Sequence, residues 1–120
     1  MSKKTVVIGA SDNPERTSFQ AVQRLVKNGH EVIAVGVREG MIGNTPVTQE
    51  KNFIADVDTV TLYVGPKNQP GWYDYILSLK PARIIFNPGT ENPEFEKMAN
   101  DKGIETPEAC TLVMLSIGNY

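Results

Sequence analysis

The stretch KTVVIGASDNPERTSF, residues Lys4 to Phe19, decides the fold class of this chain. It begins with a β-branched run that ends at Ile8, which is typical of a buried strand. Gly9 and a polar segment follow, and from Phe19 onward apolar residues recur at helical spacing until Asn28-Gly29. The order strand, polar loop, helix indicates a nucleotide-binding α/β unit, although only one glycine stands where a dinucleotide loop has G-x-G-x-x-G.

The rest of the chain alternates in the same way between apolar strands and amphipathic helices. Beyond Lys4 to Ile8, strands are predicted at Glu31 to Val37, Thr59 to Val64, Ala82 to Phe86 and Ile104 to Thr106. Helices are predicted from Trp72 to Leu79, and from Asn92-Pro93, as cap and first turn, to Gly103. The segment from Gly40 to Asp56 reads as irregular, and the tail from Thr111 to Ile117 as either a helix or an edge segment.

This alternation predicts a three-layer α/β fold of the Rossmann-like kind. Strands that are apolar throughout and separated by helices form right-handed crossovers, which place them in a parallel sheet covered on both faces, here of about five strands. The length of 120 residues suits a single domain spanning residues 1–120.

Composition limits the classes of partner. The formal net charge of -2 gives no sign of a nucleic-acid surface. Cys110 is the only cysteine and cannot form an internal disulfide, as expected in a reducing compartment. No stretch approaches the ~18 apolar residues of a membrane span. We therefore expect a cytoplasmic monomer or homodimer that binds neither nucleic acid nor membrane, with a protein partner left open.

In a parallel sheet of this kind, ligands bind beyond the carboxyl ends of the strands. The loops that follow the strands are therefore the candidate site, and the glycines in them let backbone approach a ligand closely. These loops are Gly9 to Arg16, Arg38 to Gly40, Gly65 to Lys67 and Asn87 to Glu91.

The first loop has the features of a phosphate site. Thr17 to Gln20 matches the T-x-x-Q capping box, so the helix is predicted to begin at Thr17; alternatively Asn13 is the cap and Pro14 the first helical residue. In both cases free N–H groups, the positive end of a helix dipole and Arg16 meet where the first strand ends. The competing interpretation is that Ser11 and Asn13 only cap turns and that Arg16 is solvated.

Arg38 bears on the kind of nucleotide. An acid at the end of the second strand suits the ribose of NAD, whereas a basic residue suits a phosphorylated ribose. Arg38 occupies this place and Glu39 follows it, so an acid one residue later stays open.

Together these segments resemble a known family. VVIGASDNPER from Val6 to Arg16 is the most specific part, and VIAV, LYVGP, PGTENPEFEKMANDKGI and Cys110 extend the likeness over essentially the whole chain. The chain is similar to the small CoA-binding proteins related to the N-terminal domain of the succinyl-CoA synthetase α-subunit. It differs in having Gly36-Val37 where the family usually has Asn-Pro.

The resemblance implies a Rossmann-like fold that binds coenzyme A, with no established chemistry for the stand-alone members. By position, it implies a pyrophosphate site at the first loop, adenine and 3′-phosphate contacts at the second, and further contacts at the third and fourth. The residues concerned are Gly9, Ala10, Ser11, Asn13, Arg16 and Ser18; Val37 and Arg38; Tyr63, Gly65 and Pro66; and Pro88, Gly89 and Thr90.

The sequence offers poor candidates for catalysis. His30 falls in a helix-to-strand turn on the edge opposite the expected ligand. Cys110 has no second histidine to activate it, and no His, Cys and Asp cluster has the spacing of metal ligands. Trp72, Tyr73 and Tyr75 are expected to be core or rim aromatics rather than a base-stacking platform.

The leading functional prediction is therefore a non-catalytic protein that binds coenzyme A or an acyl-CoA as a carrier, sensor or regulatory module. Two alternatives stay open. One is an oxidoreductase or redox sensor that binds NAD or NADP in the same loops, and the other is an interaction module that has lost its nucleotide.

Overall fold

The computed structural model describes residues 2–120, which form a six-stranded sheet between two layers of helices. The strands are β1 (Thr5–Ile8), β2 (Val32–Val35), β3 (Gly40–Ile42), β4 (Thr45–Thr48), β5 (Thr59–Leu62) and β6 (Arg83–Phe86). The helices are α1 (Thr17–Lys27), α2 (Tyr73–Ser78), α3 (Pro93–Asn100) and α4 (Thr111–Ser116), with short 3₁₀ turns η1 (Pro66–Asn68) and η2 (Pro70–Trp72) before α2. The predicted Rossmann-like α/β class is confirmed.

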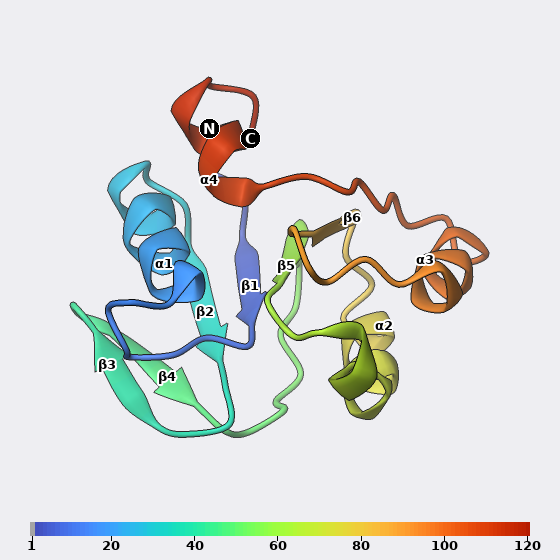
Figure 1. Cartoon of the computed structure of the whole chain (residues 1–120), viewed down its shortest axis with the longest axis horizontal. Helices are drawn as coiled ribbons and strands as arrows, with labels where there is room; N and C mark the ends of the chain where they lie inside the picture. The colour runs from blue at the N-terminus through green and yellow to red at the C-terminus, as the bar shows by residue number, and fades with distance from the viewer. Residues whose placement is uncertain (1) are drawn as a thin grey trace.

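The sheet has the order β3-β4-β2-β1-β5-β6, and all neighbouring strands are parallel except β3 and β4. β1 lies between β2 and β5, with Ile8 opposite Val35 on one side and Leu62 on the other. The chain thus winds to one side of β1 for β2 and to the other side for β5, so the winding reverses beside β1 (Figure 1).

Alternation along each strand fills two separate cores. Val6 and Ile8 of β1 face the layer of α2 and α3, where they share a buried cluster with Ile76 and Phe95. Val7 faces the opposite layer, where Val22 and Leu25 of α1 and partly buried residues of α4 cover the sheet. Both faces of the sheet are therefore closed by apolar packing, as its near-continuous apolar strands predict.

Two parts of the sheet differ from the sequence prediction. The segment expected to be irregular contains the β3–β4 hairpin, whose two-residue turn Gly43-Asn44 begins with a positive φ of 59° at Gly43. The last predicted strand is reduced to two isolated bridges, Arg83 to Glu105 and Phe86 to Glu108, which run along the outer edge of β6. The tail that was ambiguous between helix and edge segment forms α4.

The helix starts show one wrong and one correct prediction. α1 does begin at Thr17, but its N-cap is Arg16, no side chain caps it, and the T-x-x-Q box is not formed. Asn92 caps α3 as predicted, because its Oδ1 accepts a hydrogen bond from the N–H of Phe95 and Pro93 occupies the first turn.

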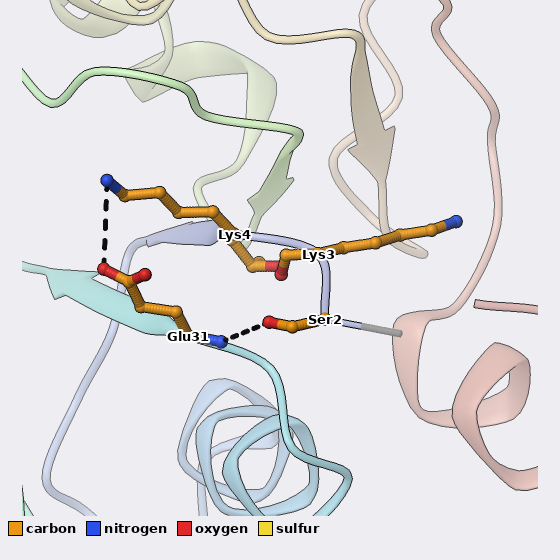
Figure 2. A network of polar contacts seen from close by, with 5 residues as sticks. Ser2, Lys3, Lys4 and Glu31 are labelled. Atoms are coloured by element: carbon orange, nitrogen blue, oxygen red, sulfur yellow. Dashed lines mark hydrogen bonds and ion pairs between the residues drawn. The ribbon is translucent and has the colours of Figure 1, made fainter.

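The amino ends of the strands form a tied edge, shown in Figure 2. The N–H of Glu31 donates to Ser2 Oγ over 3.3 Å, and the Glu31 carboxylate lies 3.8 Å from Lys4 Nζ. His30 lies here, where its Nδ1 accepts a hydrogen bond from the N–H of Lys3. His30 is thus a turn residue at the edge opposite the carboxyl ends of the strands, as predicted.

Candidate functional site: a cleft at the carboxyl ends of the strands

A cleft of about 700 Å³ opens where the winding reverses, and it is formed by the segments that follow β1, β2 and β5. Its volume lies within the roughly 300–1,000 Å³ that is usual for small-molecule sites, and its position is the one that open parallel sheets use for ligands. The lining residues are Gly9, Ala10, Ser11, Asp12, Glu15, Arg16, Thr17, Ser18, Val37, Arg38, Tyr63, Val64, Gly65, Asn68 and Trp72.

The end of β1 is bent sharply so that its loop can reach the cleft. Gly9 has a φ of 89°, and a Cβ there would lie 2.8 Å from the carbonyl oxygen of Tyr63. The N–H groups of Gly9 and Ala10 both donate to the carbonyl oxygen of Val35, which ties the turn to the end of β2. Gly9 is therefore required by both backbone conformation and close packing, which accounts for the single glycine of the loop.

The polar part of the loop folds on itself before α1. Ser11 Oγ accepts a hydrogen bond from the N–H of Asn13, and Asn13 Oδ1 accepts one from the N–H of Glu15. Within residues 2–120 the N–H groups of Thr17 and Ser18, the first two of α1, donate no hydrogen bond. These donors and the positive end of the helix dipole face a cleft that an anion can enter.

The second wall follows β2. A Cβ on Gly36 would lie 2.2 Å from the carbonyl oxygen of Ala10, so the first and second loops touch where only glycine fits. Val37, 76% exposed, and Arg38 then enter the lining, whereas Glu39 does not.

The charges of the cleft are mixed but its arginines are free. Arg16 and Arg38 both line it, and across residues 2–120 neither has a carboxylate oxygen within 4.0 Å. Asp12 and Glu15 also line it, and the Asp12 side chain packs against Gly40. Two unpaired guanidinium groups beside free N–H groups form a site for an anion with more than one charged group.

The third wall is held from behind by Gln69, a buried residue between η1 and η2. Its Nε2 donates to the carbonyl oxygens of Val64 (2.9 Å) and Thr90 (2.7 Å), and its Oε1 accepts from Asn92 Nδ2 (2.9 Å). Gln69 therefore connects the loop after β5, which lines the cleft, to the loop after β6, which does not.

Tyr63 belongs to this wall and also to the core beneath it. Its hydroxyl is buried and has no hydrogen-bond partner among the described side chains and backbone. This burial raises the pKa of the Tyr63 hydroxyl above its ordinary value, because a phenolate would be poorly solvated there. The side chain is therefore a neutral, largely apolar floor for the cleft at physiological pH.

Five of the residues predicted for the site lie outside the cleft lining: Asn13, Pro66, Pro88, Gly89 and Thr90. Asn13 is exposed and its side chain closes the turn to Glu15. Pro66 begins η1. The loop of Pro88 to Thr90 follows β6, which is separated from β1 by β5. Thr90 is buried, and it is hydrogen-bonded to Asn87 and Gln69.

The other predicted residues do come together, and six more join them. Gly9, Ala10, Ser11, Arg16, Ser18, Val37, Arg38, Tyr63 and Gly65 all line the cleft, and the residues that sequence reasoning missed are Asp12, Glu15, Thr17, Val64, Asn68 and Trp72. Most of the missed residues are neighbours of predicted ones, so a whole-loop prediction would have included them. Trp72 is the exception, because its helical spacing predicted a core or rim aromatic rather than a ligand-binding residue.

Cys110 lies apart from the cleft lining. It is a half-buried free thiol that precedes α4 as its N-cap. Across the described part of the chain, no group of three or more His, Cys, Asp or Glu residues is arranged to hold a metal ion. None of the helices in that part is long and apolar enough to cross a membrane.

With this geometry established, comparison with known proteins identifies the family. Residues 3–116 match the model of the family described as CoA binding domain. The chain belongs to that family. The predicted membership is thus confirmed, and the relation to succinyl-CoA synthetase stays a prediction.

Three similar proteins are described as uncharacterized or hypothetical. An uncharacterized protein of Bacillus subtilis, YneT, is 27% identical over 103 residues, which are 85% of this chain and 76% of that protein. A crystal structure of another uncharacterized protein is 48% identical with a TM-score of 0.97 and covers 100% of this chain and 99% of its own. A hypothetical protein of Pyrococcus horikoshii, 21% identical with a TM-score of 0.87 over 97% of this chain and 83% of its own, shares the fold.

Proposed function

We propose that this protein binds coenzyme A or an acyl-CoA in the cleft, without catalysing a reaction on it, as a carrier, sensor or regulatory module. Membership of the CoA binding domain family supports the ligand class. The observation that carries the proposal is the pairing of free N–H groups at Thr17 and Ser18 with two arginines that lack carboxylate partners among residues 2–120. Coenzyme A carries a pyrophosphate and a separate 3′-phosphate, which matches two anion-binding elements on two walls.

The roles follow from the positions in the cleft. The pyrophosphate would be held at the start of α1 by the loop Gly9 to Ser11, the N–H groups of Thr17 and Ser18, and Arg16. Adenine would lie against the exposed Val37, with the 3′-phosphate near Arg38. Pantetheine would leave along Tyr63 and Gly65. These residues bind and orient the ligand.

A calorimetric titration tests this assignment. We expect coenzyme A to bind more tightly than dephospho-CoA, NAD or NADP. Arg38→Ala should remove about tenfold or more of the preference over dephospho-CoA, since a hydrogen bond to a charged group contributes about 1.5–3 kcal/mol. Arg24→Ala, at an exposed arginine of α1 outside the cleft, is the matched control and should leave the preference unchanged.

The other outcomes of the titration would support the alternative functions or change the role of Arg38. Tighter binding of NAD or NADP would replace the coenzyme A assignment with a nicotinamide-binding oxidoreductase or redox sensor. Binding of no nucleotide would favour an interaction module, to be pursued by co-purification of a protein partner. Equal binding of coenzyme A and dephospho-CoA would remove Arg38 from the phosphate site while leaving the cleft as the binding site.

A further inference from the structure

Trp72 gives the cleft an apolar wall that the phosphate-binding elements do not explain. It is the only tryptophan of the chain, lies at the end of η2, and is only 9% exposed, yet it lines the cleft together with Val64. The phosphate-binding groups come from the segment between β1 and α1 and from the segment after β2, whereas Trp72 and Val64 come from the segment after β5. The segment after β5 therefore adds two apolar side chains to a cleft whose charged groups all come from the other two segments.

The indole ring is fixed in place from outside. Lys51 Nζ lies 4.5 Å from the centre of the Trp72 ring and donates a 2.7 Å hydrogen bond to the carbonyl oxygen of Gly71. Tyr75 packs at 6.4 Å in a tilted arrangement, and its hydroxyl donates to the carbonyl oxygen of Asn52. A lysine over an aromatic ring and an anchored neighbouring ring hold Trp72 in one orientation.

A rigid apolar wall binds apolar ligand groups at little entropic cost. We propose that Trp72 is a specificity-determining residue and that the ligand is an acyl-CoA whose acyl group packs against Trp72 and Val64. This inference rests on the proposed function, since a nucleotide spanning the switch point places its phosphates at α1 and its acyl end beyond β5. Free coenzyme A would bind by the same phosphate contacts and leave the cleft-facing part of the indole without a ligand contact.

The test is a titration series with coenzyme A, acetyl-CoA and butyryl-CoA, followed by calorimetry and by the fluorescence of the single tryptophan. Affinity should rise along the series by about fourfold for each methylene that is buried, corresponding to ~0.8 kcal/mol per CH₂. Butyryl-CoA should change the Trp72 emission more than coenzyme A does. Trp72→Ala should lose the rise in affinity along the series.

Two further variants keep the inference falsifiable. Val64→Ala should reduce the rise, and it serves as the second test if Trp72→Ala does not fold. Phe53→Ala, at an exposed aromatic residue outside the cleft lining, is the matched control and should leave the series unchanged. Equal affinity for all three ligands, or a full rise retained in Trp72→Ala or Val64→Ala, would overturn this inference and leave coenzyme A binding intact. Binding of none of them would overturn both.

Discussion

At the level of single residues, two glycines allow the walls of the cleft to come close together. Gly9 allows the first strand to turn beneath Tyr63, and Gly36 allows the second strand to pass the carbonyl oxygen of Ala10. Only Gly9 has a positive φ of the two, so Gly36 is needed for space alone. Because backbone conformation does not require glycine at position 36, a substitution there tests the lack of space alone.

We predict that Gly36→Ala destabilises the protein, because its Cβ would lie 2.2 Å from backbone that cannot rotate away. The expected loss is about 2 kcal/mol or more in the free energy of unfolding, as for overpacked cores. The measurement is urea denaturation. Gly71→Ala is the matched control, since Gly71 has open space and an ordinary φ, and it should be near neutral. Equal stability of both variants would contradict the packing argument.

The same residues show what local sequence patterns can predict. Gly9, Arg16 and Arg38 follow strand ends, so their convergence could be predicted from the rule that ligands bind at the carboxyl ends of parallel strands. Trp72 could not be found in this way, because helical spacing predicted a core or rim aromatic, whereas Trp72 both packs in the core and lines the cleft. Gly36 could not be explained from the sequence at all, since its requirement arises from contact with Ala10.

At the scale of elements, Gln69 sets the position of the third wall. It makes three hydrogen bonds from a fully buried position, to Val64, Thr90 and Asn92. The loop of Pro88 to Thr90 therefore has a structural route to the cleft, through Gln69, although it does not line the cleft. This route explains how a loop that resembles a family site can support the site from behind.

We predict that Gln69→Leu lowers the free energy of unfolding by at least about 2 kcal/mol, because it leaves buried carbonyl oxygens of Val64 and Thr90 without a donor. Coenzyme A affinity should fall as well, because the segment Tyr63 to Gly65, along which pantetheine is proposed to lie, would lose its anchor. Chemical denaturation and calorimetry measure the two effects. Lys67→Ala, at an exposed position of η1, is the control. If Gln69→Leu matched the control in stability, the bridge would contribute nothing.

Element boundaries were predictable where local chemistry decides them. Asn92-Pro93 identified the start of α3 because cap and first turn are local features. The β3–β4 hairpin was missed although Gly43-Asn44 is a recognised two-residue turn signal, because its flanking strands have only three and four residues and the second contains Pro46. The T-x-x-Q box at α1 failed because Arg16 became the cap and left the first N–H groups open.

In the molecule as a whole, the carboxyl ends and the amino ends of the strands differ in structure and in proposed role. The carboxyl edge carries the cleft, whereas the amino edge is closed by hydrogen bonds and the Lys4–Glu31 ion pair around the start of β1 (Figure 2). His30 lies at the closed edge, and burial together with the positive charges of Lys3 and Arg83 lowers its pKa. Its neutral form also accepts the hydrogen bond from the N–H of Lys3.

This arrangement predicts a pH dependence of global stability. The folded state lowers the pKa of His30 below its ordinary value of 6.5. At pH values below about 6.5, the unfolded chain therefore binds a proton at His30 more readily than the folded chain does. The contribution of neutral His30 is therefore present above that pH and lost as the pH falls through the lowered pKa. Urea denaturation at pH 7.5 and at lower pH should show falling stability, with a smaller fall in His30→Gln. An identical fall in the variant would assign the effect to other groups.

The proposed function places coenzyme A in the cleft between the loops after β1, β2 and β5. Backbone amide NMR during titration with coenzyme A tests it most directly, because each wall has its own amide signals. We predict that the largest shifts occur at Gly9 to Ser11, Thr17, Ser18, Arg38 and Gly65, with smaller shifts at Gly89 and Thr90. Shifts centred on the loop of Gly89 and Thr90, or at the amino edge around His30, or no shifts at saturating coenzyme A, would contradict the account.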